Sequence, residues 1–281
     1  MIRSSRQLKD LVRNMSGGDG AKAQIIIRNY VMERFLERVS VSDYRENLIL
    51  KGGMLISALV GLDKRSTMDM DTTIKSMPLT VDSTRKLIVS IISIDLDDNM
   101  TFEMQSIAPI MDEAEYPGIR VLLEATLETM RTPFRLDFST GDIITPSEIS
   151  YTYKLLFEER TISILAYNLE TIVAEKMETI VARGTANTRM RDFYDIYTID
   201  SMLLNSVDES VLYNAFHNTC EQRGSSSVVK DTNLIIDEIE SSTAMIGLWN
   251  SYKKKYDYAS EIGWNSVILA IRKFYASVAE S

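Results

Sequence analysis

The chain has 281 residues, of which 45% are hydrophobic and 25% are charged, and its net charge is −9. This composition is typical of a globular protein with one large domain or two modest ones, which excludes a disordered chain. The acidic total excludes a general nucleic-acid-binding surface, so any contact with nucleic acid is confined to a local basic patch.

Several common signals are missing from the sequence. Cys220 is the single cysteine and has no partner for an intrachain disulfide, and the single histidine, His217, lacks the second ligand of a zinc site. No apolar run approaches the roughly 20 residues of a membrane span, and the first residues do not resemble a signal peptide. We therefore expect a cytoplasmic protein without a membrane-spanning segment.

The chain begins with two stretches of helical periodicity, at 5–15 and 21–39, separated by the turn Ser16–Gly20. We expect their Arg and Lys side chains to lie on solvated faces. These helices precede the stretch that organises the chain.

That stretch runs from Leu48 to Asp71 and combines a glycine pair with two alternate carboxylates. It predicts a short strand, the pair Gly52-Gly53, a helix over 54–60, and a second strand carrying Asp69 and Asp71. Glycines at a helix start leave backbone N–H groups available for a phosphate. Aspartates two apart on a strand share one face, which suits Mg²⁺ bound by carboxylates and substrate phosphates. Taken singly, each feature is more often a turn or a solvated strand face, so the prediction depends on their joint order.

A third carboxylate follows in the first half of the chain. A helix is predicted from Thr80 through 92, then strands at 101–110 and 121–127 with a turn at 116–118, and a strand over 134–138 that contains Asp137. A buried strand aspartate needs a metal or a basic partner. Asp137 is thus either a third metal ligand, which we favour, or the partner of Arg135 or another basic residue across the sheet.

From 168 onward the sequence reads as entirely helical, after one more short strand at 163–167. Within the first two of these helices, Lys176 lies among apolar residues and Asp192 lies in the first turn of the second helix. Lys176 can bind a triphosphate as a point charge, or the two helices can simply be joined by ion pairs without chemistry. The sequence therefore predicts an α+β first half, residues 1–167, and a helical second half, residues 168–281.

Three ordered motifs resemble one family. These are Lys51-Gly-Gly with the following Arg65-Ser-Thr-Met-Asp-Met-Asp71, the stretch Phe134-Arg-Leu-Asp-Phe-Ser-Thr-Gly-Asp142, and Ala174-Glu-Lys-Met-Glu178 with Asn187-Thr-Arg-Met-Arg-Asp-Phe-Tyr-Asp195. Together they are similar to the AbiEii/AbiGii toxin family of nucleotidyltransferases. The resemblance implies a polymerase-β-like mixed sheet with flanking helices, whose active-site cleft is completed by the helical half.

The resemblance also implies roles for individual residues. Asp69 and Asp71 would bind Mg²⁺, with Asp137 as a further ligand, and Lys176 and Asp192 would join them in catalysis. Nucleotide binding would use a set of six residues: Lys51, Gly52, Gly53, Arg65, Ser66 and Lys176. One departure is that Met54 stands where the superfamily often has serine, so a hydroxyl donor to the phosphate is lost.

The implied function is that of a toxin in a type IV toxin–antitoxin and abortive-infection system, active in phage defence. Such an enzyme would transfer a nucleotide from GTP or another nucleoside triphosphate to RNA, such as a tRNA 3′ end, or to a protein hydroxyl. Its genetic partner would be a winged-helix antitoxin that represses the operon without forming a direct complex. The alternative is a nucleotide-binding toxin that acts by occupying a partner, which would have no need for paired aspartates.

Overall fold

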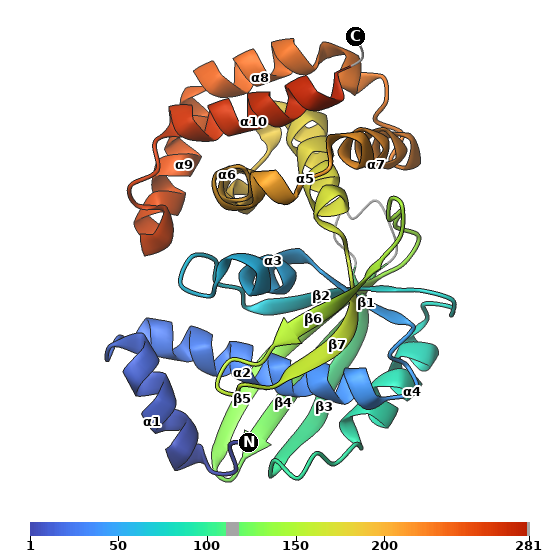
Figure 1. Cartoon of the computed structure of the whole chain (residues 1–281), viewed down its shortest axis with the longest axis vertical. Helices are drawn as coiled ribbons and strands as arrows, with labels where there is room; N and C mark the ends of the chain where they lie inside the picture. Colours follow the sequence, from blue (N-terminus) through green and yellow to red (C-terminus); the bar gives the residue numbers. More distant parts are fainter. Residues whose placement is uncertain (111–117, 280–281) are drawn as a thin grey trace. The chain divides into compact units, whose positions relative to one another are not determined.

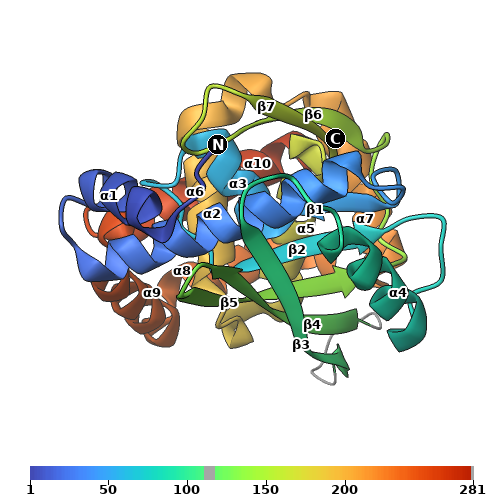
Figure 2. The same cartoon turned by 90° about the horizontal axis from the view of Figure 1, so that it is seen from below.

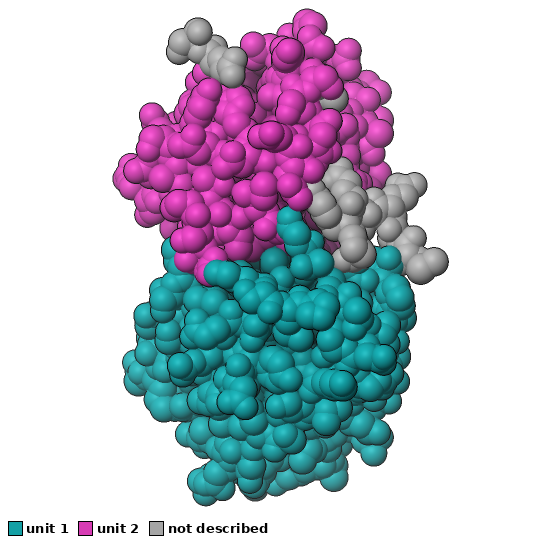
Figure 3. All heavy atoms as spheres, turned by 90° about the vertical axis from the view of Figure 1, so that its right-hand side faces the viewer, with its two compact units in different colours: residues 1–141, 149–166 teal, residues 142–148, 167–281 magenta. Residues whose placement is uncertain are grey.

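The computed structural model describes residues 1–110 and 118–279, and these divide into two compact units (Figure 3). Unit 1 comprises residues 1–141 and 149–166, and unit 2 comprises residues 142–148 and 167–281. The predicted turn at 116–118 falls outside the described residues, apart from Gly118, which begins a strand. None of the described helices is long and apolar enough to cross a membrane.

Unit 1 is built on a mixed sheet. Within the described residues its seven strands have the order β3-β4-β5-β2-β1-β7-β6, with β2–β5 and β1–β7 parallel and the other pairs antiparallel. The strands are β1 (Leu48–Lys51), β2 (Asp69–Ile74), β3 (Met100–Ile110), β4 (Gly118–Leu127), β5 (Met130–Ser139), β6 (Ile149–Lys154) and β7 (Thr161–Ala166). The α+β class and the mixed sheet expected from the sequence are confirmed.

Four helices of unit 1 are described: α1 (Ser5–Ser16), α2 (Gly20–Val41), α3 (Gly52–Val60) and α4 (Val81–Ile92). Helix α2 lies along one face of the sheet, and α1 packs against α2 (Figures 1 and 2). Thr80 caps α4 in a reciprocal capping box with Ser83, as its position in the sequence predicts.

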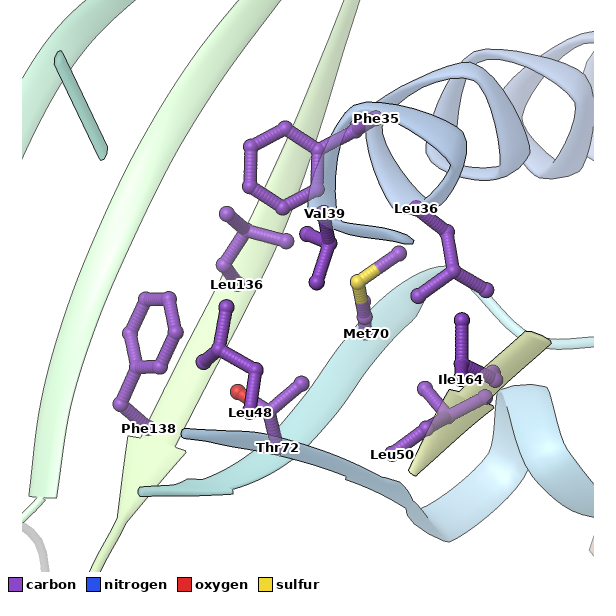
Figure 4. A pocket seen from close by; sticks show the side chains of 10 residues that line it. All are labelled: Phe35, Leu36, Val39, Leu48, Leu50, Met70, Thr72, Leu136, Phe138 and Ile164. Atoms are coloured by element: carbon purple, nitrogen blue, oxygen red, sulfur yellow. The ribbon is translucent and has the colours of Figure 1, made fainter. Parts of the chain in front are cut away.

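The core of unit 1 lies between α2 and the sheet. Figure 4 shows the side chains that meet there around a cavity of about 10 Å³: Phe35, Leu36, Val39, Leu48, Leu50, Met70, Thr72, Leu136, Phe138 and Ile164. Successive strand residues point to opposite faces, so these positions leave the alternate residues of β2 and β5 on the other face of the sheet. Those alternate residues are the predicted carboxylates.

The expectation that the basic residues of α2 are solvated is wrong for Arg34 and Arg38, which are 0% and 1% exposed. The Arg38 guanidinium donates to both oxygens of Asp98, at 3.0 and 2.8 Å, and Arg34 forms ion pairs with Glu37, Asp98 and Glu158. Burial works against ionisation of Asp98, but the Arg38 hydrogen bonds and charge lower its pKa below the usual value. Glu37 lies on α2 itself, but Asp98 and Glu158 come from distant segments, so helical periodicity alone does not predict the burial of these arginines.

Strand β6 was not predicted. It is an edge strand of the sheet, and its sequence Ile-Ser-Tyr-Thr-Tyr-Lys is largely polar and exposed. Ile149, Tyr151 and Tyr153 alternate with polar residues, a strand pattern that our prediction overlooked.

Unit 2 is helical over its described residues, as the sequence predicts. Its helices are α5 (Leu169–Arg183), α6 (Met190–Leu203), α7 (Glu209–Gln222), α8 (Thr232–Ser241), α9 (Thr243–Lys255) and α10 (Trp264–Val278). The segment 142–148 joins this unit through Thr145, whose carbonyl accepts from Asn168 Nδ2 at 2.6 Å and whose hydroxyl accepts from Asn218 Nδ2 at 3.0 Å.

Thr72 offers a test of the core of unit 1. Its hydroxyl is buried and has no hydrogen-bond partner among the described residues, whereas the Thr73 hydroxyl bonds that of Ser139 at 3.1 Å. Thr72→Val keeps the shape and removes an unsatisfied polar group, so it should raise the free energy of unfolding by about 1 kcal/mol. The matched control Thr73→Val should lower it. Denaturant unfolding of both variants measures these changes. Equal destabilisation of the two would show that the Thr72 hydroxyl is not unsatisfied.

Glu33 gives the fold a dependence on pH. Burial raises the pKa of its carboxyl from 4.5 to about 8, although a hydrogen bond from the Leu156 N–H acts in the opposite direction. Between these two values the unfolded chain loses the proton and the folded chain keeps it, so stability falls as pH rises toward 8, by up to about 1.4 kcal/mol per pH unit. Glu33→Gln should remove that slope. Melting curves of the two proteins from pH 5 to 8 should therefore diverge in favour of the variant; parallel curves would show that Glu33 does not titrate in this range.

Candidate active site

The three predicted carboxylates of unit 1 lie on one face of the sheet. In the strand register Asp71 of β2 is paired with Lys51 of β1 on one side and with Asp137 of β5 on the other, and Asp69 is paired with Arg135. Register partners point to the same face, and residues two apart on a strand do so as well. Lys51, Asp71 and Asp137 therefore form a single rung across three adjacent strands.

The start of α3 approaches this rung very closely. Gly52 has φ +66°, and a Cβ added to it would lie 2.2 Å from Asp71 Oδ2. A Cβ on Gly53 would lie 2.7 Å from the Thr67 hydroxyl oxygen. Lys51, the residue that precedes the helix, makes no side-chain cap hydrogen bond. The glycine pair thus brings the uncapped first turn of a helix next to Asp71, and such a turn favours anions.

The loop that follows α3, residues 65–67, is linked to the first turn of the helix through Ser57. Arg65, Ser66 and Thr67 are 3%, 7% and 3% exposed. The Ser57 hydroxyl donates to the Gly53 carbonyl at 2.8 Å and also to the Arg65 carbonyl. Arg65 and Ser66 are both buried, and their predicted nucleotide contacts stay predictions. Ser57 was not among the predicted site residues, because the sequence alone does not show which face of α3 lies against the loop.

Two arginines accompany the carboxylates. Arg120 of β4 donates to both oxygens of Asp137, at 2.8 and 2.7 Å, and Arg135 Nε lies 3.1 Å from Asp69 Oδ1. The sequence left Arg135 or another basic residue open as the partner of Asp137, and the observed partner is Arg120. The pairing follows from the β4–β5 register, which places Arg120 opposite Asp137 and which the sequence does not disclose.

Asp69 and Asp71 are residues of the type that binds Mg²⁺ in proteins, and their role as metal ligands stays a prediction. They present carboxylate oxygens on one face, Asp69 is 29% exposed, and Mg²⁺ is usually bound by one or two carboxylates together with substrate phosphates. Asp137 fits a third position only if Arg120 releases it, because both its oxygens accept from that guanidinium. Among residues 1–110 and 118–279, no group of three acidic, His or Cys side chains is arranged to hold a metal.

The second predicted site lies within unit 2, between α5 and α6. Lys176 Nζ lies 2.7 Å from Asp192 Oδ1 and 2.8 Å from Asp195 Oδ2, and these carboxylates are 5% and 0% exposed. Burial lowers the pKa of Lys176, but the two carboxylates outweigh it and raise that pKa above its usual value. Lys176 is therefore a fixed cation. Asp192 also pairs with Arg189, whose Nε lies 3.0 Å from Oδ2.

Local sequence explains how these helices are placed. Asn168 caps α5 by accepting from the Thr171 N–H at 3.1 Å, and Gly184, with φ +50°, ends it. The fully buried Asn187 then accepts from the Arg189 N–H at 2.8 Å and donates to the Thr179 carbonyl at 3.3 Å. Asn187 fixes the entry into α6, and it was not among the predicted site residues.

Comparison with solved structures identifies the fold. A structure from H. pylori described as a nucleotidyltransferase has 12% identity and a TM-score of 0.50, covering 91% of this chain and 96% of its own. JHP933 from Helicobacter pylori has 13% identity and a TM-score of 0.50, covering 91% and 93%. The fold is therefore that of the nucleotidyltransferases.

The family is defined more narrowly by the sequence. The family model described as nucleotidyl transferase AbiEii toxin, type IV TA system, matches residues 34–270. The chain belongs to the AbiEii family of nucleotidyl transferase toxins, which confirms the resemblance seen in its motifs. A comparison with curated proteins gave no match.

The close approach at Gly52 is testable by stability alone. Gly52→Ala must accept a left-handed backbone and displace the Asp71 carboxylate, so it should lower the free energy of unfolding by about 1 kcal/mol or more. Gly247, in the interior of α9, has open space within 4 Å of its added Cβ. Gly247→Ala should therefore stabilise by up to about 1 kcal/mol. Both are read from denaturant unfolding, and a neutral Gly52→Ala would refute the steric argument.

The Lys176 ion pairs predict a second contrast. Lys176→Met leaves Asp192 and Asp195 buried without their shared cation, and breaking a buried pair costs about 3–5 kcal/mol. Lys273, 53% exposed and 2.8 Å from Asp200, is the matched surface pair. Lys273→Met should change the free energy of unfolding by no more than about 1 kcal/mol. Similar losses from the two substitutions would show that Lys176 is not held as described.

Proposed function

We propose that the protein transfers a nucleotide from a nucleoside triphosphate to an acceptor, using Mg²⁺ bound by Asp69 and Asp71. The observation that carries the proposal is the position of Asp71. It shares one strand face with Asp69 and lies against the uncapped, glycine-rich start of α3. A place for a cation and a place for a phosphate thus adjoin each other, as transfer of a nucleotide requires.

The protein's part in such a reaction is to position groups and to stabilise charge. The backbone N–H groups of Gly52 and Gly53, with Lys51, are proposed to bind the triphosphate. Bound Mg²⁺ would activate the attacking oxygen and stabilise the pyrophosphate that leaves the α-phosphorus. Asp137 can bind the metal as a further ligand only if Arg120 moves away. Otherwise the Arg120–Asp137 ion pair links strands β4 and β5.

Lys176 and Asp192 are proposed to act in nucleotide binding and catalysis. The two buried carboxylates keep Lys176 charged, so it is suited to a triphosphate, while Asp192 orients it. Arg at position 176 should not fully replace it, because a planar guanidinium does not match a pocket that binds a point charge.

The proposed biological setting follows from the family. The protein would act in the cytoplasm as the toxin of a type IV pair during phage defence, with GTP as one candidate substrate. Its winged-helix antitoxin would regulate the operon without a stable complex. RNA, such as a tRNA 3′ end, is the preferred acceptor, and a protein hydroxyl is the other candidate.

Incubation with each α-labelled nucleoside triphosphate, Mg²⁺ and total cellular RNA or protein tests the reaction. Label should enter one fraction with the native protein and should be absent with Asp69→Asn or Asp71→Asn, because either change removes a carboxylate ligand. Growth arrest that persists in a folded Asp69→Asn, Asp71→Asn double variant would favour toxicity by occupancy instead.

Nucleotide binding has its own readout. The correct nucleoside triphosphate with Mg²⁺ should raise the melting temperature, since a ligand at a hundredfold excess over Kd stabilises the folded state by about 2.7 kcal/mol. Gly52→Ala and Lys176→Arg should reduce this shift, and Gly247→Ala should leave it unchanged. If no nucleotide at millimolar concentration changes the melting temperature, the proposed phosphate site is wrong.

A further inference from the structure

Four tyrosines gather in unit 2 where α9 ends and α6 begins. Tyr194 and Tyr252 are 3% and 8% exposed and belong to the core of the unit. Tyr256 and Tyr258 are only partly buried, and their rings stack with centroids 5.3 Å apart and an interplanar angle of 20°. The buried pair supports the outer pair, because the Tyr194 and Tyr258 centroids are 4.8 Å apart and those of Tyr252 and Tyr256 are 4.7 Å apart.

Cations surround the outer tyrosines. Arg191 donates to the Tyr256 hydroxyl at 3.0 Å, and its Cζ lies 5.7 Å from the ring centroid. Lys255 Nζ lies 5.4 Å from the same centroid. Burial raises the pKa of Tyr256, but Arg191 and Lys255 outweigh it and lower that pKa below its usual value. The Tyr256 ring is thus partly buried, rigidly held and in a positive environment.

The last turn of α9 adds a run of three lysines, Lys253, Lys254 and Lys255. A helix C-terminus favours lysines, which accounts for their position along the helix. Within the described part of the chain no ion pair involves any of the three, although Asp257 lies two residues beyond Lys255. In a chain of net charge −9, such a group is suited to a polyanion.

We propose that Arg191, Lys253–Lys255, Tyr256 and Tyr258 form a platform that binds single-stranded RNA. Bases stack on tyrosine rings and phosphates interact with the surrounding cations, the combination by which proteins bind unpaired nucleic acid. The bases of a duplex are already stacked within the helix and cannot stack on these rings, and a protein acceptor has no bases to stack. The platform rests on the proposed function, for which it supplies the acceptor-binding surface.

Helix α6 connects this platform with the proposed catalytic lysine. Arg191, in the platform, and Asp192, which binds Lys176 at 2.7 Å, are consecutive residues of its first turn. An RNA segment bound on the platform is therefore held at the end of α6 whose Asp192 contacts Lys176.

Fluorescence anisotropy with labelled ten-nucleotide adenine RNA tests the platform, without nucleoside triphosphate or metal and from 50 to 200 mM KCl. Tyr256→Ala should weaken binding about 5- to 150-fold, the range found when one stacking aromatic is removed. Tyr256→Phe keeps the ring and should bind within about twofold of the native protein. Replacing Lys253, Lys254 and Lys255 by Gln should reduce the salt slope of log K by about 2.

The matched control replaces three exposed lysines elsewhere, Lys9, Lys22 and Lys230, by Gln, which changes net charge equally. It should leave affinity and slope unchanged. Equal effects of the two triple variants, equal binding of a duplex of the same length, or unchanged affinity in a folded Tyr256→Ala variant would overturn the platform. Because no transfer is measured, Asp69→Asn should bind RNA normally, so loss of the proposed reaction and loss of the platform are distinguishable.

Discussion

The contact between Gly52 and Asp71 is the constraint on which the rest of unit 1 depends. No residue with a Cβ fits at Gly52 without moving the carboxylate, so the strand, the helix start and the second strand have one way to meet. The buried loop 65–67 and the Ser57 hydroxyl hold the helix start from one side. The β2–β5 register aligns Asp137 from the other side. The site is therefore rigid because of backbone proximity more than because of side-chain packing.

Charge in this protein is arranged in compensated groups. Arg34 and Arg38 are buried against acids from distant segments, Lys176 is buried against two aspartates, and Arg120 covers both oxygens of Asp137. Each group is stable only when all its members are present, because an unpaired buried charge is costly. The lysines at the end of α9 belong to no such group, and we assign them an external partner because they adjoin Tyr256 and Tyr258.

Much of this architecture can be predicted from the sequence. The parts that cannot be predicted have one cause in common. Short-range patterns predict the strand, glycine pair, helix and strand around Asp71, the helix that begins at Thr80, and the helical second half. The features that the sequence does not predict depend on contacts between distant segments. The pairing of Arg120 with Asp137 depends on strand register, and the burial of Arg34 depends on loops that cover α2. Asn187 and Ser57 act through backbone carbonyls that only the fold brings near.

The segment 142–148 lies between two strands of unit 1 but belongs to unit 2, to which the Thr145 carbonyl and hydroxyl bind it. Neither unit is therefore a continuous stretch of chain, and no single cut separates them cleanly. During synthesis, unit 1 has all its residues once Ala166 has left the ribosome. The segment 142–148 can form its hydrogen bonds only after Asn168 and, later, Asn218 have left the ribosome. The chain is thus expected to fold in sequence, with an internal loop of the first unit kept available as the first element of the second.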